Sequence, residues 1–194
     1  MVLYFDHDLA CRQMAAVSNL STEQVRDFVF ASGLERQYEL GMIDDREFYE
    51  RFCALAGVRP DMAALLRAGS DIFRLNVPVM SVVAALDSAG YRLGLLSNTC
   101  PAHWAYCGQG RFGLIKRAFS IYALSFQLGA LKPDAKIYLA AAKLAGAGPE
   151  EIFFVDDIAE HVTGACAAGF DAVQFTTVPQ LVADLRARGL AFNY

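Results

Sequence analysis

Three short polar segments in the second half of the chain carry the side chains best suited to chemistry. Ser97-Asn98-Thr99 ends one apolar run, Lys132 lies in the loop 129–134, and Asp156-Asp157 ends another apolar run. A hydroxyl and an ammonium group can bind phosphate oxygens, and a carboxylate pair can bind a hard divalent cation such as Mg²⁺. Each segment alone would also suit a helix cap or a turn. Their order favours one shared phosphate and metal site.

Strand–helix alternation after Pro78 supplies the elements that would position these groups. Continuous apolar strands are expected at 91–96, 118–122, 151–155 and 171–175, and helices at 79–88, 101–107, 135–145, around 165–168 and at 179–188. This pattern predicts an α/β fold, with a Rossmann-like parallel sheet covered by helices on both faces. Ligands of such sheets bind beyond the carboxyl ends of the strands, where the three polar segments fall.

The first part of the chain has a different, helical texture. Ser21 precedes Gln24 by three residues and Asp44 precedes Glu47 by three, which is the spacing of helix N-terminal caps. Glycines punctuate the region, and no long alternating strand is visible. We expect a helical bundle over 8–76 and an α/β unit formed by 1–7 and 77–194.

Composition excludes several classes of protein. Of 194 residues 55% are hydrophobic and 20% charged, which is enough apolar material for a folded core. The formal net charge is −4 without clustered cations, so neither nucleic acid nor a membrane surface is expected as a partner. The five cysteines are scattered, and the N-terminus has no signal-peptide pattern. We expect a reduced, cytoplasmic protein whose apolar excess is buried in its core or in a homodimer interface.

The polar segments and their flanks resemble a known set of motifs. Leu95-Leu96-Ser97-Asn98-Thr99, Gly129-x-x-Lys132-Pro133-Asp134 and Phe153-x-Val155-Asp156-Asp157 are similar to motifs II, III and IV of the haloacid-dehalogenase superfamily. The chain resembles most the small bacterial phosphatases that include glucose-1-phosphate phosphatases. Their helical cap is similar to the bundle over 8–76, which carries Glu39-x-Gly41-x-Ile43. The resemblance implies a Rossmann-like core with a helical cap.

The resemblance also implies a role for each matching residue. Ser97 would bind the transferring phosphoryl group, Asn98 would shape the phosphate site, and Lys132 would neutralise the phosphoryl group and the nucleophile. Asp157 would be the Mg²⁺ ligand, with Asp156 as a second ligand. The implied activity is Mg²⁺-dependent hydrolysis of a small phosphorylated metabolite, such as a sugar phosphate.

The nucleophile can be aligned in two ways. In the first alignment, residues 1–5 form the leading strand, Asp6 is the nucleophile and Asp8 is the acid/base. However, Leu9-Ala10 replaces the glycine that would let the backbone turn away from a phosphate. In the second alignment, residues 1–3 follow the motif and Asp6 begins the cap, so residues 1–194 would contain neither the strand nor its aspartate. The spacing to Glu39-x-Gly41 favours the second alignment.

Three functions therefore remain as hypotheses. The first is a metal-dependent phosphatase, and the second is a catalytically impaired or truncated homologue that keeps the fold without the nucleophile. The third is a haloacid dehalogenase, which uses the same fold without Mg²⁺. The acidic pair Asp156-Asp157 favours the phosphatase over the dehalogenase.

Overall fold

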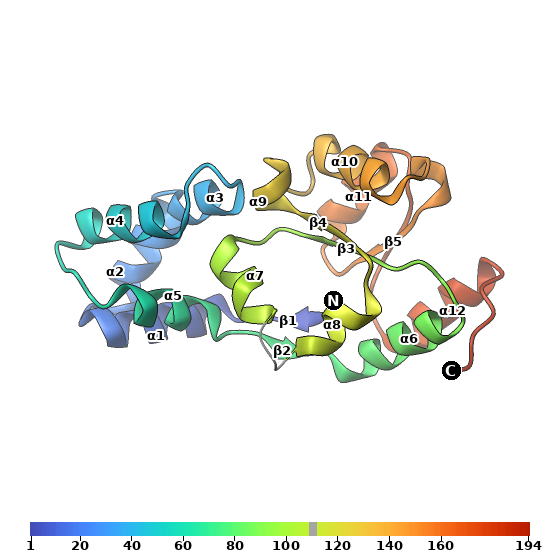
Figure 1. Ribbon diagram of the computed structural model, residues 1–194, viewed down its shortest axis with the longest axis horizontal. Coiled ribbons are helices and arrows are strands. Elements are labelled where there is room, and N and C mark those ends of the chain that lie inside the picture. Colours follow the sequence, from blue (N-terminus) through green and yellow to red (C-terminus); the bar gives the residue numbers. More distant parts are fainter. Residues whose placement is uncertain (109–111) are drawn as a thin grey trace.

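The computed structural model describes residues 1–108 and 112–194 and shows two units side by side (Figure 1). The helical unit contains the α-helices α1 to α5 and a π-helical turn. Their bounds are α1 His7–Ser18, α2 Thr22–Arg26, the turn Asp27–Ala31, α3 Leu34–Glu39, α4 Asp45–Ala56 and α5 Met62–Ser70. The predicted caps are present, because Ser21 and Asp44 each form a reciprocal capping box, with Gln24 and Glu47 respectively.

The helical unit is closed by a short antiparallel strand pair. β1 (Leu3–Tyr4) enters the unit and pairs with β2 (Arg74–Leu75), which leaves it. Inside, apolar side chains from several helices form one buried cluster that includes Val25, Phe52 and Leu65. This cluster removes a continuous apolar surface from water, which is the main stabilising contribution for a unit of this size.

The α/β unit follows in chain order. Its elements are α6 Val77–Ser88, β3 Gly94–Ser97, α7 Pro101–Cys107, α8 Gly113–Ala118, β4 Ile121–Leu124, α9 Ser125–Leu128, α10 Ala135–Ala145, a 3₁₀ turn Pro149–Glu151, β5 Phe153–Asp156, α11 Ala159–Ala167, β6 Asp171–Gln174 and α12 Val178–Ala187. In Figure 1 the strands lie between α10 and α11 on one side and α6 and α12 on the other. The predicted α/β class with helices on both faces is confirmed.

The parallel strands form two separate pairs instead of one sheet. β3 pairs with β4, so that Leu95 lies opposite Tyr122, and β5 pairs with β6, so that Phe154 lies opposite Ala172. No ladder joins β3 to β5 within 1–108 and 112–194. Most residues of these strands are only partly buried, although strands of a parallel sheet are normally fully covered. Each strand therefore has backbone groups on one side that no neighbouring strand pairs.

The two units touch through backbone at Gly41. This glycine has φ of +66°, and a Cβ atom built on it would lie 2.0 Å from the carbonyl oxygen of Phe126 in α9. Glycine is thus required for the close approach as well as for the backbone conformation. Nearby, the Tyr38 hydroxyl accepts a hydrogen bond from the Ala102 backbone N–H at 3.3 Å. These contacts hold α3 over the carboxyl end of β3.

None of the helices in the described part of the chain has the length and apolar character needed to cross a lipid bilayer.

Candidate active site

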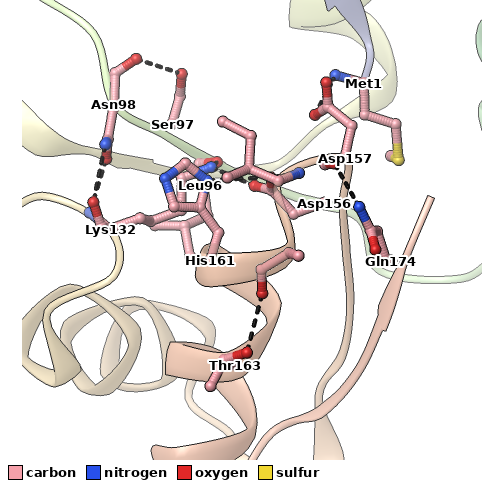
Figure 2. Close-up of polar contacts among 12 residues, drawn as sticks. Met1, Leu96, Ser97, Asn98, Lys132, Asp156, Asp157, His161, Thr163 and Gln174 are labelled. Atoms are coloured by element: carbon pink, nitrogen blue, oxygen red, sulfur yellow. Dashed lines mark hydrogen bonds and ion pairs between the residues drawn. The ribbon is translucent and has the colours of Figure 1, made fainter. Parts of the chain in front are cut away.

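The polar segments singled out in the sequence meet at the carboxyl ends of β3 and β5 (Figure 2). The Lys132 side chain joins them. Its Nζ donates to Asp156 Oδ2 at 2.5 Å and to the Leu96 carbonyl oxygen at 3.3 Å. Both partners of this ion pair are buried, with the Lys132 side chain 9% and the Asp156 side chain 7% exposed. The Lys132 ammonium group is therefore hydrogen-bonded to both strand pairs, to β3 at Leu96 and to β5 at Asp156.

Asn98 fixes the loop that carries Lys132. Its side-chain amide donates to the Lys132 carbonyl oxygen at 3.1 Å, and its Oδ1 accepts the Lys132 backbone N–H at 2.8 Å. Both hydrogen-bonding groups of the amide are thus engaged by one residue. These two hydrogen bonds hold the Lys132 backbone against the end of β3.

Ser97 is the last residue of β3 and lies beside this loop. Its hydroxyl donates to the Asn98 carbonyl oxygen at 3.1 Å. Figure 2 shows Ser97 and Asn98 above the Lys132 side chain, at the same end of the strand. A hydroxyl can rotate to donate to a bound oxyanion, so Ser97 can exchange this local bond for one to a phosphate oxygen.

Both carboxylate oxygens of Asp156 are engaged within the protein. Oδ1 accepts the Ile158 backbone N–H at 2.9 Å and contacts His161 Nδ1 at 3.1 Å, while Oδ2 accepts from Lys132. Burial raises the pKa of Asp156, but hydrogen bonds from His161 and Lys132 together with the lysine charge hold it well below its usual value. Asp156 is therefore an ionised group whose contacts orient Lys132 and the start of α11.

Asp157 differs from its neighbour in exposure. Its side chain is 50% exposed, and Oδ1 lies 3.1 Å from the Met1 amino group. The described residues contain no cluster of three or more His, Cys, Asp and Glu side chains that could hold a metal. Mg²⁺ commonly binds one or two carboxylates and completes its shell with water and substrate phosphate. The accessible Asp157 carboxylate fits that mode, whereas Asp156 has both oxygens committed.

Asp6 lies away from these groups, at the entrance to the helical unit. Its carboxylate caps α1 by accepting the Leu9 backbone N–H at 2.8 Å, and Arg12 lies 3.7 Å away. Within the described residues, no hydrogen bond or ion pair joins it to Ser97, Lys132 or Asp157. The preceding strand β1 is antiparallel to β2 and belongs to neither parallel pair. Asp6 is thus the N-cap of the first helix of the helical unit.

Glu39, at the end of α3, is a site residue that the sequence analysis used only as part of a family motif. Burial raises its pKa to about 7, although the charges of Lys132, Arg36 and His161 act in the opposite direction. The charges of Lys132 and His161 thus act on Glu39, which puts this carboxyl of the helical unit within electrostatic range of the α/β site. The spacing of Glu35 and Glu39 predicts that both lie on one helical face, but it does not predict which surface that face meets.

Comparison with known proteins identifies the family. The family model described as haloacid dehalogenase-like hydrolase matches residues 29–169, which include Ser97, Lys132 and Asp157. Among curated proteins, the chain is similar to D-ribitol-5-phosphate phosphatase of Bacteroides thetaiotaomicron. The two are 24% identical over 179 residues, which cover 90% of this chain and 86% of the relative.

Solved structures share the fold. A haloacid dehalogenase family enzyme of Bacteroides thetaiotaomicron, in complex with magnesium and inorganic phosphate, has a TM-score of 0.78 at 21% identity and covers 90% of this chain and 89% of its own. A HAD-like hydrolase from Porphyromonas gingivalis reaches 0.79 at 22% identity, with 95% and 93% coverage. L-2-haloacid dehalogenase of Xanthobacter autotrophicus is less similar, with a TM-score of 0.62 at 19% identity and coverage of 96% and 80%. By sequence motifs, fold and family model alike, the chain belongs to the haloacid dehalogenase-like hydrolases.

Proposed function

We propose that this hydrolase acts on phosphomonoesters of small metabolites, with a phosphorylated sugar or sugar alcohol as substrate. The observation that carries the proposal is the buried Lys132 ammonium beside Ser97 at the carboxyl end of β3. A phosphoryl group placed there would receive hydrogen bonds from one cation and one hydroxyl, which are complementary donors for an oxyanion. The similarity to a ribitol-5-phosphate phosphatase supports the sugar-alcohol class.

Each residue of the site has a defined task in this proposal. Lys132 neutralises phosphoryl charge, Ser97 donates to a phosphoryl oxygen, and Asn98 together with Asp156 keeps Lys132 in place. Asp157 would hold Mg²⁺, which supplies further neutralisation of the phosphoryl charge when bound. The relative solved with magnesium and phosphate supports this assignment.

The test is turnover and binding by the 194-residue chain. Hydrolysis of p-nitrophenyl phosphate and D-ribitol 5-phosphate is measured with and without Mg²⁺, alongside binding of inorganic phosphate by calorimetry. We expect Lys132→Met and Ser97→Ala each to abolish phosphate binding, because each removes a donor. Phosphate binding that survives both substitutions would reject the site.

A catalytically impaired homologue is the second candidate, and the placement of Asp6 favours it. Its carboxylate caps α1, and no described contact brings it to Lys132. This candidate predicts phosphate binding with turnover near background, unchanged by Asp6→Asn. Addition of an upstream strand ending in Asp-x-Gly-Asn would then restore turnover, because it supplies the nucleophile. Mg²⁺-dependent turnover that Asp6→Asn abolishes would assign the nucleophile to Asp6 instead. Hydrolysis of 2-chloropropionate tests the dehalogenase alternative.

A further inference from the structure

His161, in the first turn of α11, has one ring nitrogen engaged and the other open. Its Nδ1 lies 3.1 Å from Asp156 Oδ1, and both side chains are largely buried, being 13% and 7% exposed. Among the described residues, no hydrogen bond reaches Nε2, and Nε2 is not one of the buried polar atoms that lack a partner. Nε2 is therefore accessible to a small ligand beside the carboxyl end of β5.

The contact with Asp156 decides which nitrogen of the neutral ring carries the hydrogen. Burial raises the pKa of Asp156, but hydrogen bonds from His161 and Lys132 hold it well below its usual value, so the carboxyl is ionised. An ionised carboxylate can only accept hydrogen bonds, and Nδ1 must therefore donate to it. In the neutral ring Nε2 then has no hydrogen and presents a lone pair. It is an acceptor beside the donors Lys132 and Ser97.

His161 and Lys132 border the same site. They contact the two oxygens of one carboxylate, because Lys132 Nζ donates to Asp156 Oδ2 at 2.5 Å while His161 contacts Oδ1. The charges of both residues also act on Glu39 of α3. In Figure 2 the imidazole ring lies within the group formed by Ser97, Lys132 and Asp156. A phosphoryl group bound by Lys132 and Ser97 is therefore within reach of Nε2 through one water molecule.

Hydrolysis of a phosphomonoester needs a water molecule whose oxygen is aimed at phosphorus. As that oxygen bonds to phosphorus, the bond from phosphorus to the ester oxygen breaks. One proton of the water stays on the new phosphate hydroxyl, and the other passes through solvent to the alcohol. An acceptor beside the phosphoryl group can hold the water by the first O–H and turn its lone pair toward phosphorus. The Lys132 ammonium cannot do this, because it has no lone pair.

We propose that His161 binds the attacking water, with Nε2 accepting a hydrogen bond from that water and, after reaction, from the hydroxyl of the product phosphate. The inference rests on the proposed phosphomonoesterase function and adds the residue that holds its water. Asp156 would serve two groups at once, since it positions the Lys132 ammonium and the His161 ring. The proposal predicts a preference between two tetrahedral dianions. HPO₄²⁻ has a hydroxyl to donate to Nε2, and SO₄²⁻ has none.

The first experiment observes the ring without any turnover. The chain contains 3 histidines, so long-range ¹H–¹⁵N spectra of the full chain at pH 8 can follow each ring, and His161→Asn identifies the His161 signals. We expect the hydrogen of the His161 ring on Nδ1. Inorganic phosphate should shift the Nε2 resonance, and sulfate at equal occupancy should not. Equal shifts with the two ions, or a hydrogen on Nε2 in place of Nδ1, would overturn the inference.

The second experiment separates the hydrogen bond to Asp156 from the hydrogen bond to water. His161→Asn keeps an amide that can donate to Asp156 but has no group in the place of Nε2. It should weaken phosphate binding about fivefold in calorimetry and leave sulfate binding within about twofold. It should lower kcat for p-nitrophenyl phosphate at least about tenfold and leave KM within about twofold. His7→Asn, at the first residue of α1, is the matched control and should change none of these values.

The outcomes distinguish this inference from the proposed function. If His161→Asn weakens both ions alike, the histidine acts only by holding Asp156 and Lys132, and the inference is wrong. If the wild-type chain hydrolyses phosphomonoesters and His161→Asn keeps the wild-type kcat, the inference is wrong while the proposed function stands. If no phosphomonoester is hydrolysed but phosphate alone shifts Nε2, the proposed function fails while the contact with the phosphate hydroxyl stands. The spectra of the wild-type chain decide the question even where His161→Asn does not fold.

Discussion

At the scale of single residues, the buried pair Lys132–Asp156 has two roles that can be separated by measurement. It presents an ammonium group to the site, and it bridges β3 and β5. Lys132→Met should lower the free energy of unfolding by about 3 kcal/mol, because it leaves Asp156 ionised and without its cation. Urea denaturation at pH 7 measures this. The double variant Lys132→Met/Asp156→Asn should recover part of the loss, and a further loss would contradict the pairing.

The carboxyl of Glu35 should control how stability depends on pH. Burial and the neighbouring Glu39 raise the pKa of Glu35 to about 8, and His7 Nε2 lies 3.7 Å from its Oε1. Since the unfolded chain releases this proton near pH 4.5, the contribution of Glu35 to stability is complete below that value and is lost as pH rises toward 8. Glu35→Gln should flatten this decline and stabilise the protein at pH 8 by at least about 2 kcal/mol. Thermal denaturation between pH 5 and 8 would show it, with Glu23→Gln expected to keep the wild-type slope.

Asp157 carries the prediction about metal binding. Because its half-exposed carboxylate is the ligand that fits Mg²⁺, millimolar Mg²⁺ should raise the melting temperature of the protein, and Asp157→Ala should remove that rise. Asp87→Ala, at an exposed position in α6, is the matched control and should retain the response. An unchanged Mg²⁺ response in Asp157→Ala would show that the ion binds elsewhere.

At the scale of elements, the contact between Gly41 and α9 should be intolerant of any side chain. Gly41→Ala places a Cβ atom 2.0 Å from the Phe126 carbonyl oxygen, so the helical unit must shift. Gly57 has nearly the same positive φ, +69°, but a Cβ there would meet nothing within 4 Å. Gly57→Ala should therefore cost only the backbone strain, about 1 kcal/mol. Gly41→Ala should cost clearly more in urea denaturation. Equal costs would mean that the two units do not touch at this point.

Elements marked by local chemistry could be predicted from the sequence, and those shaped by distant contacts could not. The capping boxes at Ser21 and Asp44 each need only two side chains three residues apart, so the sequence spacing is enough to predict them. The expected strand at 118–122 instead begins at Ile121, because residues 113–118 form α8. The site motifs could be predicted because polar residues such as Ser97 and Asp156 follow directly on apolar runs in the sequence. Glu39 reaches the site only because α3 folds over β3, which no local pattern encodes.

At the scale of the whole molecule, the division of the parallel strands has a direct signature in hydrogen exchange. Asp171 N–H bonds to the Ile152 carbonyl oxygen and Phe175 N–H to that of Asp156, so even-numbered residues of this segment face β6. Residues alternate along a strand, which turns the Val155 amide away from β6. Its amide proton should exchange at least about tenfold faster than that of Phe154, as followed by ¹H–¹⁵N spectra in D₂O. Equal protection would indicate that another backbone covers this edge.

The missing ladder between β3 and β5 also bears on cooperativity. In a continuous sheet, main-chain hydrogen bonds would join neighbouring strands. In this molecule, the Lys132 side chain joins the two strand pairs. Apolar side chains such as Leu93 and Phe175, which pack in two of the core clusters, also join them. Side chains, and not a main-chain ladder, therefore hold the two pairs together, and we expect the seam between them to open more easily than a continuous sheet would. Weakening a few side chains at this seam would convert one unfolding transition into two.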